Sequence, residues 1–264
     1  MTVPNELINP SPLSSLKNGL KPNDIIHRYC SLPELDSLLG GNLTLTSPLR
    51  WTEGDPFEHP LFRASLIGID GKPHDITRWG KQFHCQSWTL NEESDVMWRL
   101  YGEDASGVRI SARAEGLLFQ AYNSHSLFEH GEYLKVQLGI VRYLPELELK
   151  EILMNEFKSL IAPENADNGV LESLFLKREA YQLENEVRLV ANDGSNLGNR
   201  ETGRVTAPLI DLHWISEIKF GPRMDQERFE NYRNQLVQLD FDASKVRQSN
   251  LYGPLSYVID LSKK

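Results

Sequence analysis

The sequence lacks most of the patterns that mark metalloproteins, secreted proteins and membrane proteins. Only two of its 264 residues are cysteines, Cys30 and Cys85, and neither a Cys-x-x-Cys pair nor a His-Glu-x-x-His helix is present. A zinc site therefore has no support. A disulfide between the two cysteines stays open, but buried, reduced thiols are the expectation in the cytoplasm. No apolar run approaches the roughly 20 residues that a membrane-spanning helix needs.

Positive charge is also scarce. The chain carries 28 Lys and Arg against 37 Asp and Glu, a formal net charge of −9. Binding of nucleic acid without regard to sequence depends on neutralising phosphates, so the composition argues against it but leaves a local basic cleft open. The first residues lack the basic-then-apolar layout of a secretory signal. We expect a cytoplasmic protein without a membrane partner, with a flexible N-terminal lead over residues 1–20.

Glycine-rich and nucleophile motifs are missing as well. No Gly-x-Gly-x-x-Gly follows a predicted strand and no phosphate-binding loop is found, so any nucleotide has to be bound in another way. Gly-x-Ser-x-Gly is absent too, and no Ser-His-Asp arrangement can be assembled.

What is present is a mixture of short strands and short helices without regular strand-helix-strand alternation. Neither a repeat nor a linker between domains is evident, so residues 21–264 read as a single α+β domain. Period-two and helical patterns predict strands over 23–32, 42–48, 81–90, 106–114, 132–144, 181–191 and 214–222, and helices over 32–41, 94–102, 145–162, 168–178 and 225–239, with loops at 49–63 and 192–203. The chain closes on the stretch LSYVIDL, residues 255–261.

The stretch YQLENEVRLVA, residues 181–191, places charge on a predicted strand. Alternation puts Glu184, Glu186 and Arg188 on one face, which is either a solvated surface or the floor of a cleft. Residues two apart on a strand lie about 6.5–7 Å apart. Two desolvated carboxylates at that distance repel each other, so either the pKa of one of them is raised or each needs a cation beside it. Arg188 is a candidate for that cation.

The segment HRYC, residues 27–30, is a second candidate for a binding site. Alternation puts His27 and Tyr29 on one face of the predicted strand and Arg28 on the other. A histidine or arginine on a central strand can hold a diphosphate or a ribose through charge-assisted hydrogen bonds. A partly buried histidine satisfied by the backbone is the commoner alternative.

Two further segments carry candidate side chains. Ser87, on a predicted strand, either bonds a ribose or orders the strand. Trp98 and Tyr101 are three residues apart on a predicted helix and share a face. They form either a core anchor, which is the default, or a wall on which a flat heterocycle stacks.

Five segments in order resemble the bacterial domain of unknown function 2971 family. Its members share a tyrosine-bearing first strand, an N-D-P-F-E-like loop, a C-x-S strand, an M-W-x-x-Y helix and a K-then-E-x-E-x-R segment. The resemblance covers about residues 25–190, and Gly54 departs from the asparagine usual in the loop. The matching stretches read HRYCSLPELDSLLGGNLTLTSPLRWTEGDPFE, CQSWTLNEESDVMWRLYGEDASGVRI and FLKREAYQLENEVRLV.

The order of these elements is also similar to the ADP-ribosyltransferase layout. That resemblance implies a mixed, largely antiparallel split sheet with flanking short helices, which binds NAD without a glycine-rich loop. By this similarity Glu186 is catalytic and Glu184 orients or deprotonates the acceptor. Arg28 or His27 would hold the phosphates or the ribose of NAD, and Ser87 would order the site. Tyr101 or Trp98 would stack on nicotinamide. Tyr29 and Arg188 would make further contacts with the cofactor.

The function implied is transfer of ADP-ribose from NAD to RNA, DNA or protein, with a role as a bacterial toxin or phage-defence effector. An antitoxin or chaperone would be a further partner, and without an acceptor the same site would hydrolyse NAD. Two alternatives stay open. One is a non-catalytic binding or regulatory module, and the other is an enzyme acting on nucleic acid with Lys177, Arg178 and Arg188 as a basic wall.

Overall fold

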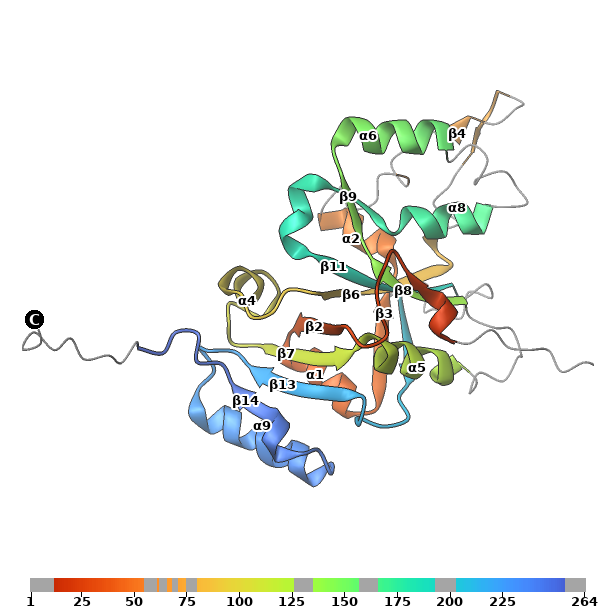
Figure 1. Ribbon diagram of the computed structural model, residues 1–264. Helices are drawn as coiled ribbons and strands as arrows, with labels where there is room; N and C mark the ends of the chain where they lie inside the picture. Colours follow the sequence, from red (N-terminus) through yellow and green to blue (C-terminus); the bar gives the residue numbers. More distant parts are fainter. Residues whose placement is uncertain are drawn as a thin grey trace, which may run out of the picture.

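A mixed β-sheet surrounded by short helices forms one α+β domain in the computed structural model (Figure 1), as the sequence predicts. The structure describes residues 12–54, 61, 66–67, 71–74, 80–125, 135–156, 166–192 and 203–254. Within the predicted lead, residues 12–20 include the 3-10 helix η1 (Pro12–Ser15) and strand β1, which pairs with β8. The folded domain therefore starts before residue 20.

The main sheet runs in the order β1-β8-β11-β6-β2-β7-β13-β14. The first and last pairs are parallel and the pairs between them are antiparallel. The sheet is thus mixed and largely antiparallel. Its strands are β1 (Leu16–Lys17), β8 (Lys135–Ile140), β11 (Glu186–Asn192), β6 (Phe83–Thr89), β2 (Ile25–Cys30), β7 (Val108–Arg113), β13 (Ile215–Phe220) and β14 (Val246–Gln248).

The sheet splits along one edge of β6. Strand β2 pairs with β6 only at Thr89, whereas β3 (Asn42–Thr46) pairs with it only at Cys85. Strand β3 also pairs with β12 (Arg204–Pro208), and in Figure 1 it crosses the main strands steeply. Between the two contacts, Arg28 Nη1 donates to the carbonyl of Ser87 at 2.9 Å. A guanidinium therefore bonds β6 where a paired strand would otherwise do so.

Helices cover both faces of the sheet. The face that carries Val187 and Leu189 packs against α1 (Leu32–Leu39), α5 (Ala114–His125) and α9 (Gln226–Gln238) in the largest core cluster. The opposite face packs Val190 against α8 (Ala166–Ser173), and Tyr29 against α4 (Asp95–Tyr101). The side chains of β11 are buried on both faces, which excludes a solvated surface there.

Local signals explain where several helices begin. Ser31 and Glu34 form a reciprocal capping box at the start of α1, and the Asp225 side chain accepts from the backbone of Arg228 at the start of α9. Ser94 occupies the N-cap position of α4, but its side chain makes no capping hydrogen bond. Pro145 occupies the N-cap position of α6 (Glu146–Glu151), where the predicted helix 145–162 begins.

Several predicted boundaries are wrong. The predicted loop at 49–63 contains helix α2 (Pro48–Gly54), which Pro48 opens. The predicted helix 168–178 ends at Ser173, because the chain then turns into β10 (Leu176–Arg178) to pair in parallel with β9 (Arg142–Leu144). The predicted helix 145–162 passes from α6 into the π-helix η3 (Ile152–Glu156).

The charged stretch 181–191 is also not one strand. Residues Glu179–Glu184 form the 3-10 helix η4, and β11 begins only at Glu186. Asn185 between them has φ 44°, the left-handed conformation that asparagine tolerates.

The remaining elements are small. Strand β12 was missed in the sequence. Parts of the predicted elements, including 55–60, and the closing stretch 255–261 lie outside the described residues. The other short elements are β4 (Leu66–Ile67), β5 (Pro73–His74) and the 3-10 helix η5 (Ala243–Lys245). Cys30 and Cys85 are buried free thiols. Across the described ranges, no helix combines the length and apolar character that crossing a membrane requires.

Candidate functional site

Two adjoining cavities open at the split in the sheet. Their volumes are about 190 Å³ and 600 Å³, and together they fall in the range of roughly 300–1,000 Å³ typical of small-molecule sites. We call them the small and the large cavity. The residues that line both are Arg28, Trp51, Ser87, Trp88 and Tyr101.

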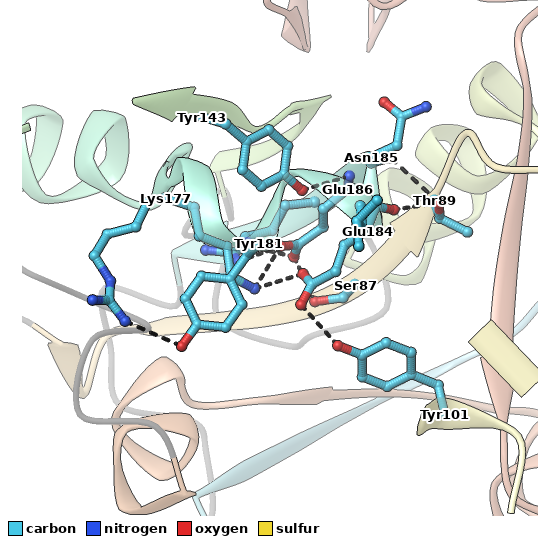
Figure 2. Close-up of polar contacts among 12 residues, drawn as sticks. Ser87, Thr89, Tyr101, Tyr143, Lys177, Tyr181, Glu184, Asn185 and Glu186 are labelled. Carbon is cyan, nitrogen blue, oxygen red and sulfur yellow. Dashed lines mark hydrogen bonds and ion pairs between the residues drawn. The ribbon is translucent and has the colours of Figure 1, made fainter. Parts of the chain in front are cut away.

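The carboxylate of Glu186 lies at the small cavity, with both oxygens bonded (Figure 2). Oε1 accepts from Ser87 Oγ at 2.6 Å and from Arg188 Nε at 2.7 Å, and Oε2 accepts from Arg188 Nη2 at 2.7 Å. Burial alone would raise the pKa of Glu186, but the charges of Arg188 and Lys177 and the hydrogen bonds from Arg188 and Ser87 lower it to about 2. The group therefore stays ionised at neutral pH.

Arg188 lies behind this carboxylate rather than in the cavity. Its side chain is fully buried, and its Nη1 donates to the carbonyl of Leu174 at 2.7 Å. The guanidinium also lies 5.1 Å from the centre of the Trp51 ring. It lines neither cavity, so the structure does not bring Arg188 to the place of a cofactor contact. Its bonds make it the counterion that fixes Glu186.

Lys177 is the cation that two carboxylates share. Its Nζ lies 2.6 Å from Glu184 Oε2 and 3.5 Å from Glu186 Oε2. The same nitrogen is 4.8 Å from the centre of the Tyr181 ring. The Lys177 side chain is only 4% exposed and Arg188 is fully buried, so two of the three side chains of the predicted basic wall for nucleic acid do not lie at the surface. Lys177 instead belongs to the small cavity.

Glu184 differs from Glu186 in both position and titration. Its other oxygen, Oε1, accepts from the Tyr101 hydroxyl at 2.8 Å, as Figure 2 shows. Burial raises the pKa of Glu184, and the charge of Glu186 adds to this, while Lys177 and Tyr101 oppose it. The pKa values of the two carboxylates are thus shifted in opposite directions, the arrangement that assigns acid-base and electrostatic roles to neighbouring groups.

The left-handed turn at Asn185 brings both carboxylates to Lys177. Backbone contacts hold this turn in place (Figure 2). Thr89 Oγ1 donates to the carbonyl of Glu184 at 2.5 Å, and the backbone N–H of Glu186 donates to the hydroxyl of Tyr143 at 2.9 Å. Tyr143 lies on β9 directly opposite Lys177. The small paired unit of β9 and β10 therefore positions the cation and the turn together.

His27 and Tyr29 line the small cavity from β2. His27 is 6% exposed, and its Nδ1 lies 2.8 Å from Ser111 Oγ. No hydrogen bond within the described ranges engages its Nε2. Burial, together with the charges of Arg109 and Lys219, lowers the pKa of His27 to about 4. The imidazole is therefore neutral at physiological pH and presents a polar atom without charge.

Trp98 is a core residue, whereas Tyr101 is a wall of the site. The Trp98 side chain is fully buried and packs edge-on against Tyr29, with ring centres 4.8 Å apart. It lines neither cavity, while Tyr101 lines both. The default reading of a core anchor thus holds for Trp98. A stacking role stays a prediction for Tyr101.

The structure brings together most of the residues singled out in the sequence. Trp51, Trp88, Thr89 and Met97 also line the small cavity and were missed. Alternation could have indicated Thr89, which lies on the same face of β6 as Ser87. Within the described residues, no group of three or more His, Cys, Asp and Glu side chains is placed to hold a metal ion. The predicted residues at the small cavity are His27, Arg28, Tyr29, Ser87, Tyr101, Glu184 and Glu186.

Fold and site define a split-sheet α+β protein with a ligand-sized cleft and a buried ionised carboxylate. Residues 97–189 match the model of the family described as a protein of unknown function (DUF2971). The match confirms the family predicted from the sequence over that part of the chain. It includes Tyr101, Lys177, Glu184 and Glu186, whereas β2 and Ser87 precede it. No curated protein and no solved structure matches the chain.

Proposed function

We propose that the cleft binds NAD and that the protein transfers ADP-ribose from it to a macromolecular acceptor, as ADP-ribosyltransferases do. One observation carries the proposal. The ionised carboxylate of Glu186, bonded by Ser87, and the carboxylate of Glu184, whose pKa is raised, line the same cavity and share Lys177.

Breaking the bond between nicotinamide and ribose builds positive charge on the sugar, as in glycoside cleavage. A fixed negative charge next to that sugar stabilises the transition state without reorganisation. Glu186 supplies such a charge, because its pKa of about 2 keeps it ionised and three hydrogen bonds at 2.6–2.7 Å hold it still. It acts as an electrostatic stabiliser and transfers no proton.

Glu184 is the base in this proposal. An acceptor group attacks the ribose carbon and loses a proton, which a carboxylate with a raised pKa takes more readily. Glu184 is more exposed than Glu186, with 16% of its side chain accessible against 2%. It is therefore the carboxylate that an incoming acceptor reaches.

Two side chains of β2 are available to hold the dinucleotide. Arg28 lines both cavities, and guanidinium groups bind phosphates by charge-assisted hydrogen bonds. The neutral His27 suits a ribose hydroxyl. Binding through these side chains fits a chain that has no glycine-rich phosphate loop.

The acceptor can be protein, RNA or DNA, and transfer to water makes the protein an NAD glycohydrolase. A role as a toxin or phage-defence effector, with an antitoxin or chaperone as partner, belongs to the same proposal. Toxicity on expression that Glu186→Ala relieves is the expected sign of it.

The direct test is release of nicotinamide from NAD, followed by chromatography. We expect turnover by the wild type and a loss of about 10²–10³-fold in Glu186→Gln, the effect of removing one preorganised electrostatic group. Glu217→Gln, which changes a carboxylate of β13 outside both cavities, is the matched control and should keep activity. If the wild type does not turn over NAD with water, protein or nucleic acid as the acceptor, the enzyme proposal is wrong and the alternative of a non-catalytic binding module is favoured.

A further inference from the structure

The large cavity has a chemistry of its own. It lies beside α1, β3 and β6, and many of its lining side chains carry hydroxyl or amide groups. Groups of this kind can hydrogen-bond a polar ligand. They belong to Ser31, Ser37, Asn42, Thr44, Thr46, Gln86, Ser87 and Tyr101.

The charge of the large cavity is positive. Among the described residues that line it, only Arg28, Glu34 and Arg204 are charged. Glu34 already accepts from Arg28 Nη2 at 2.7 Å and from the backbone N–H of Ser31 at 2.9 Å. Arg204 forms no ion pair within the described part of the chain. The small cavity, in contrast, is lined by two carboxylates, Glu184 and Glu186, and two cations, Arg28 and Lys177.

The two arginines lie on either side of the split in the sheet. Arg28 comes from β2 and bonds the carbonyl of Ser87 on β6. Arg204 lies opposite Thr46 of β3, and Thr46 in turn lies opposite Cys85 of β6. Arg28 therefore reaches β6 from β2, whereas Arg204 lies on β12, one strand beyond β3, at the register of Cys85.

Aromatic rings line the same space. Trp51, Trp88 and Trp214 line the large cavity, and the Trp88 and Trp214 rings are 6.0 Å apart, centre to centre. Indole rings present broad apolar surfaces against which a flat heterocycle packs. Cations, hydroxyl groups and aromatic rings in one cavity fit a ligand with phosphate, sugar and base.

We propose that the large cavity binds the nucleoside diphosphate portion of the substrate, with Arg204 and Arg28 as the two cations at its phosphates. The inference rests on the proposed function, since the wall shared by the two cavities lets one molecule reach from Glu186 into the large cavity. It assigns to Arg204 of β12 the role of selecting substrates that carry a diphosphate.

Calorimetric titration of the full chain with ADP, ADP-ribose and adenosine tests this assignment without requiring turnover. Arg204→Ala should lower the affinity for ADP and for ADP-ribose by about tenfold or more, the loss expected for one charge-assisted contact. It should change the affinity for adenosine by less than about twofold. Arg204→Lys keeps the cation and should retain most of the affinity. Arg113→Ala, at the exposed end of β7 with 62% of its side chain accessible, is the matched control.

Unchanged ADP affinity in Arg204→Ala overturns the inference, and so does a wild type that binds no ADP. The thermal midpoint of each variant establishes that it is folded. The two proposals fail separately. Diphosphate binding through Arg204 without nicotinamide release refutes the enzyme alone, whereas nicotinamide release with the same KM for NAD in Arg204→Ala refutes the role of Arg204 alone.

Discussion

Two strands of the same sheet carry nearly the same pattern but differ in what their charges do. Strand β11 begins Glu186-Val-Arg188 and β13 contains Glu217-Ile-Lys219. Both pairs of charges lie on one face, because Glu186, Thr89, His27, Ser111 and Glu217 are paired in register across the sheet. The same alternation of a carboxylate and a cation therefore occurs on both strands.

The charged side chains of β13 are paired with other charged side chains of the protein and form a closed cluster that reaches neither cavity. Glu217 accepts from Arg109 Nη2 at 2.7 Å, and Lys219 donates to Glu93 at 3.2 Å. Glu93 also accepts from the indole of Trp98 at 3.0 Å and from the hydroxyl of Ser249. None of these residues lines either cavity. Of the two strands, only β11 places a carboxylate, that of Glu186, at the wall of a cavity.

The largest effect is expected from breaking the ion pair beneath Glu186. Arg188→Met leaves a buried carboxylate without its main counterion, and loss of one partner of a buried pair costs about 3–5 kcal/mol. Arg109→Met should cost less, because the side chain of its partner Glu217 is 25% exposed and is solvated in the variant. Urea unfolding measures both. Equal costs would show that the two clusters are energetically alike, and Glu186→Gln combined with Arg188→Met should recover part of the loss.

A change at Lys177 should move the pH dependence of activity. Glu184 has to be ionised to act as a base, so activity falls as the pH drops through its pKa. Lys177 opposes the rise in that pKa, so Lys177→Met should raise the pKa further and shift the acid limb of kcat to higher pH. Lys219→Met, the counterpart in the closed cluster, should leave the acid limb in place. A shift in both variants, or in neither, would contradict the role given to Lys177.

The smallest effect is expected at Tyr101. Its hydroxyl donates to Glu184 and lowers the pKa of that carboxyl. Tyr101→Phe should therefore move the acid limb slightly upward and reduce kcat a few-fold near neutral pH, while the thermal midpoint changes little at this exposed position. Trp98→Phe should lower the thermal midpoint and leave the acid limb of kcat in place, because Trp98 is a fully buried core residue outside both cavities. A drop in stability from Tyr101→Phe with an unmoved acid limb would make Tyr101 structural.

Local signals were enough to predict much of the fold. Helical spacing and capping residues identify α1 and α9, and alternation identifies β2, β3, β6 and β7. Three features depend on partners far away in the chain. Strand β10 forms because it pairs with β9, and β12 forms because it pairs with β3. The break in the chain at Asn185 occurs because η4 packs beside β9 and β10. Short segments do not reveal such partners.

The site was predictable to a similar degree. Alternation correctly separates the two faces of β11 and so places Glu186 and Arg188 together. It cannot tell that Arg188 lies beneath the carboxylate, nor that Lys177, predicted to be helical, reaches both carboxylates from β10. Those positions follow from burial and from the left-handed turn. A periodic pattern shows which face of a strand a side chain is on, but not how deeply that side chain is buried.

The guanidinium of Arg28 has a consequence for how the two cavities influence each other. It holds the backbone carbonyl of Ser87 with one nitrogen and the carboxylate of Glu34 with another, while the hydroxyl of Ser87 bonds Glu186. A ligand anion that drew Arg28 toward itself would weaken the hold of this side chain on β6 and loosen the serine beside the carboxylate. We therefore expect ligand binding in one cavity to alter binding in the other through this single side chain.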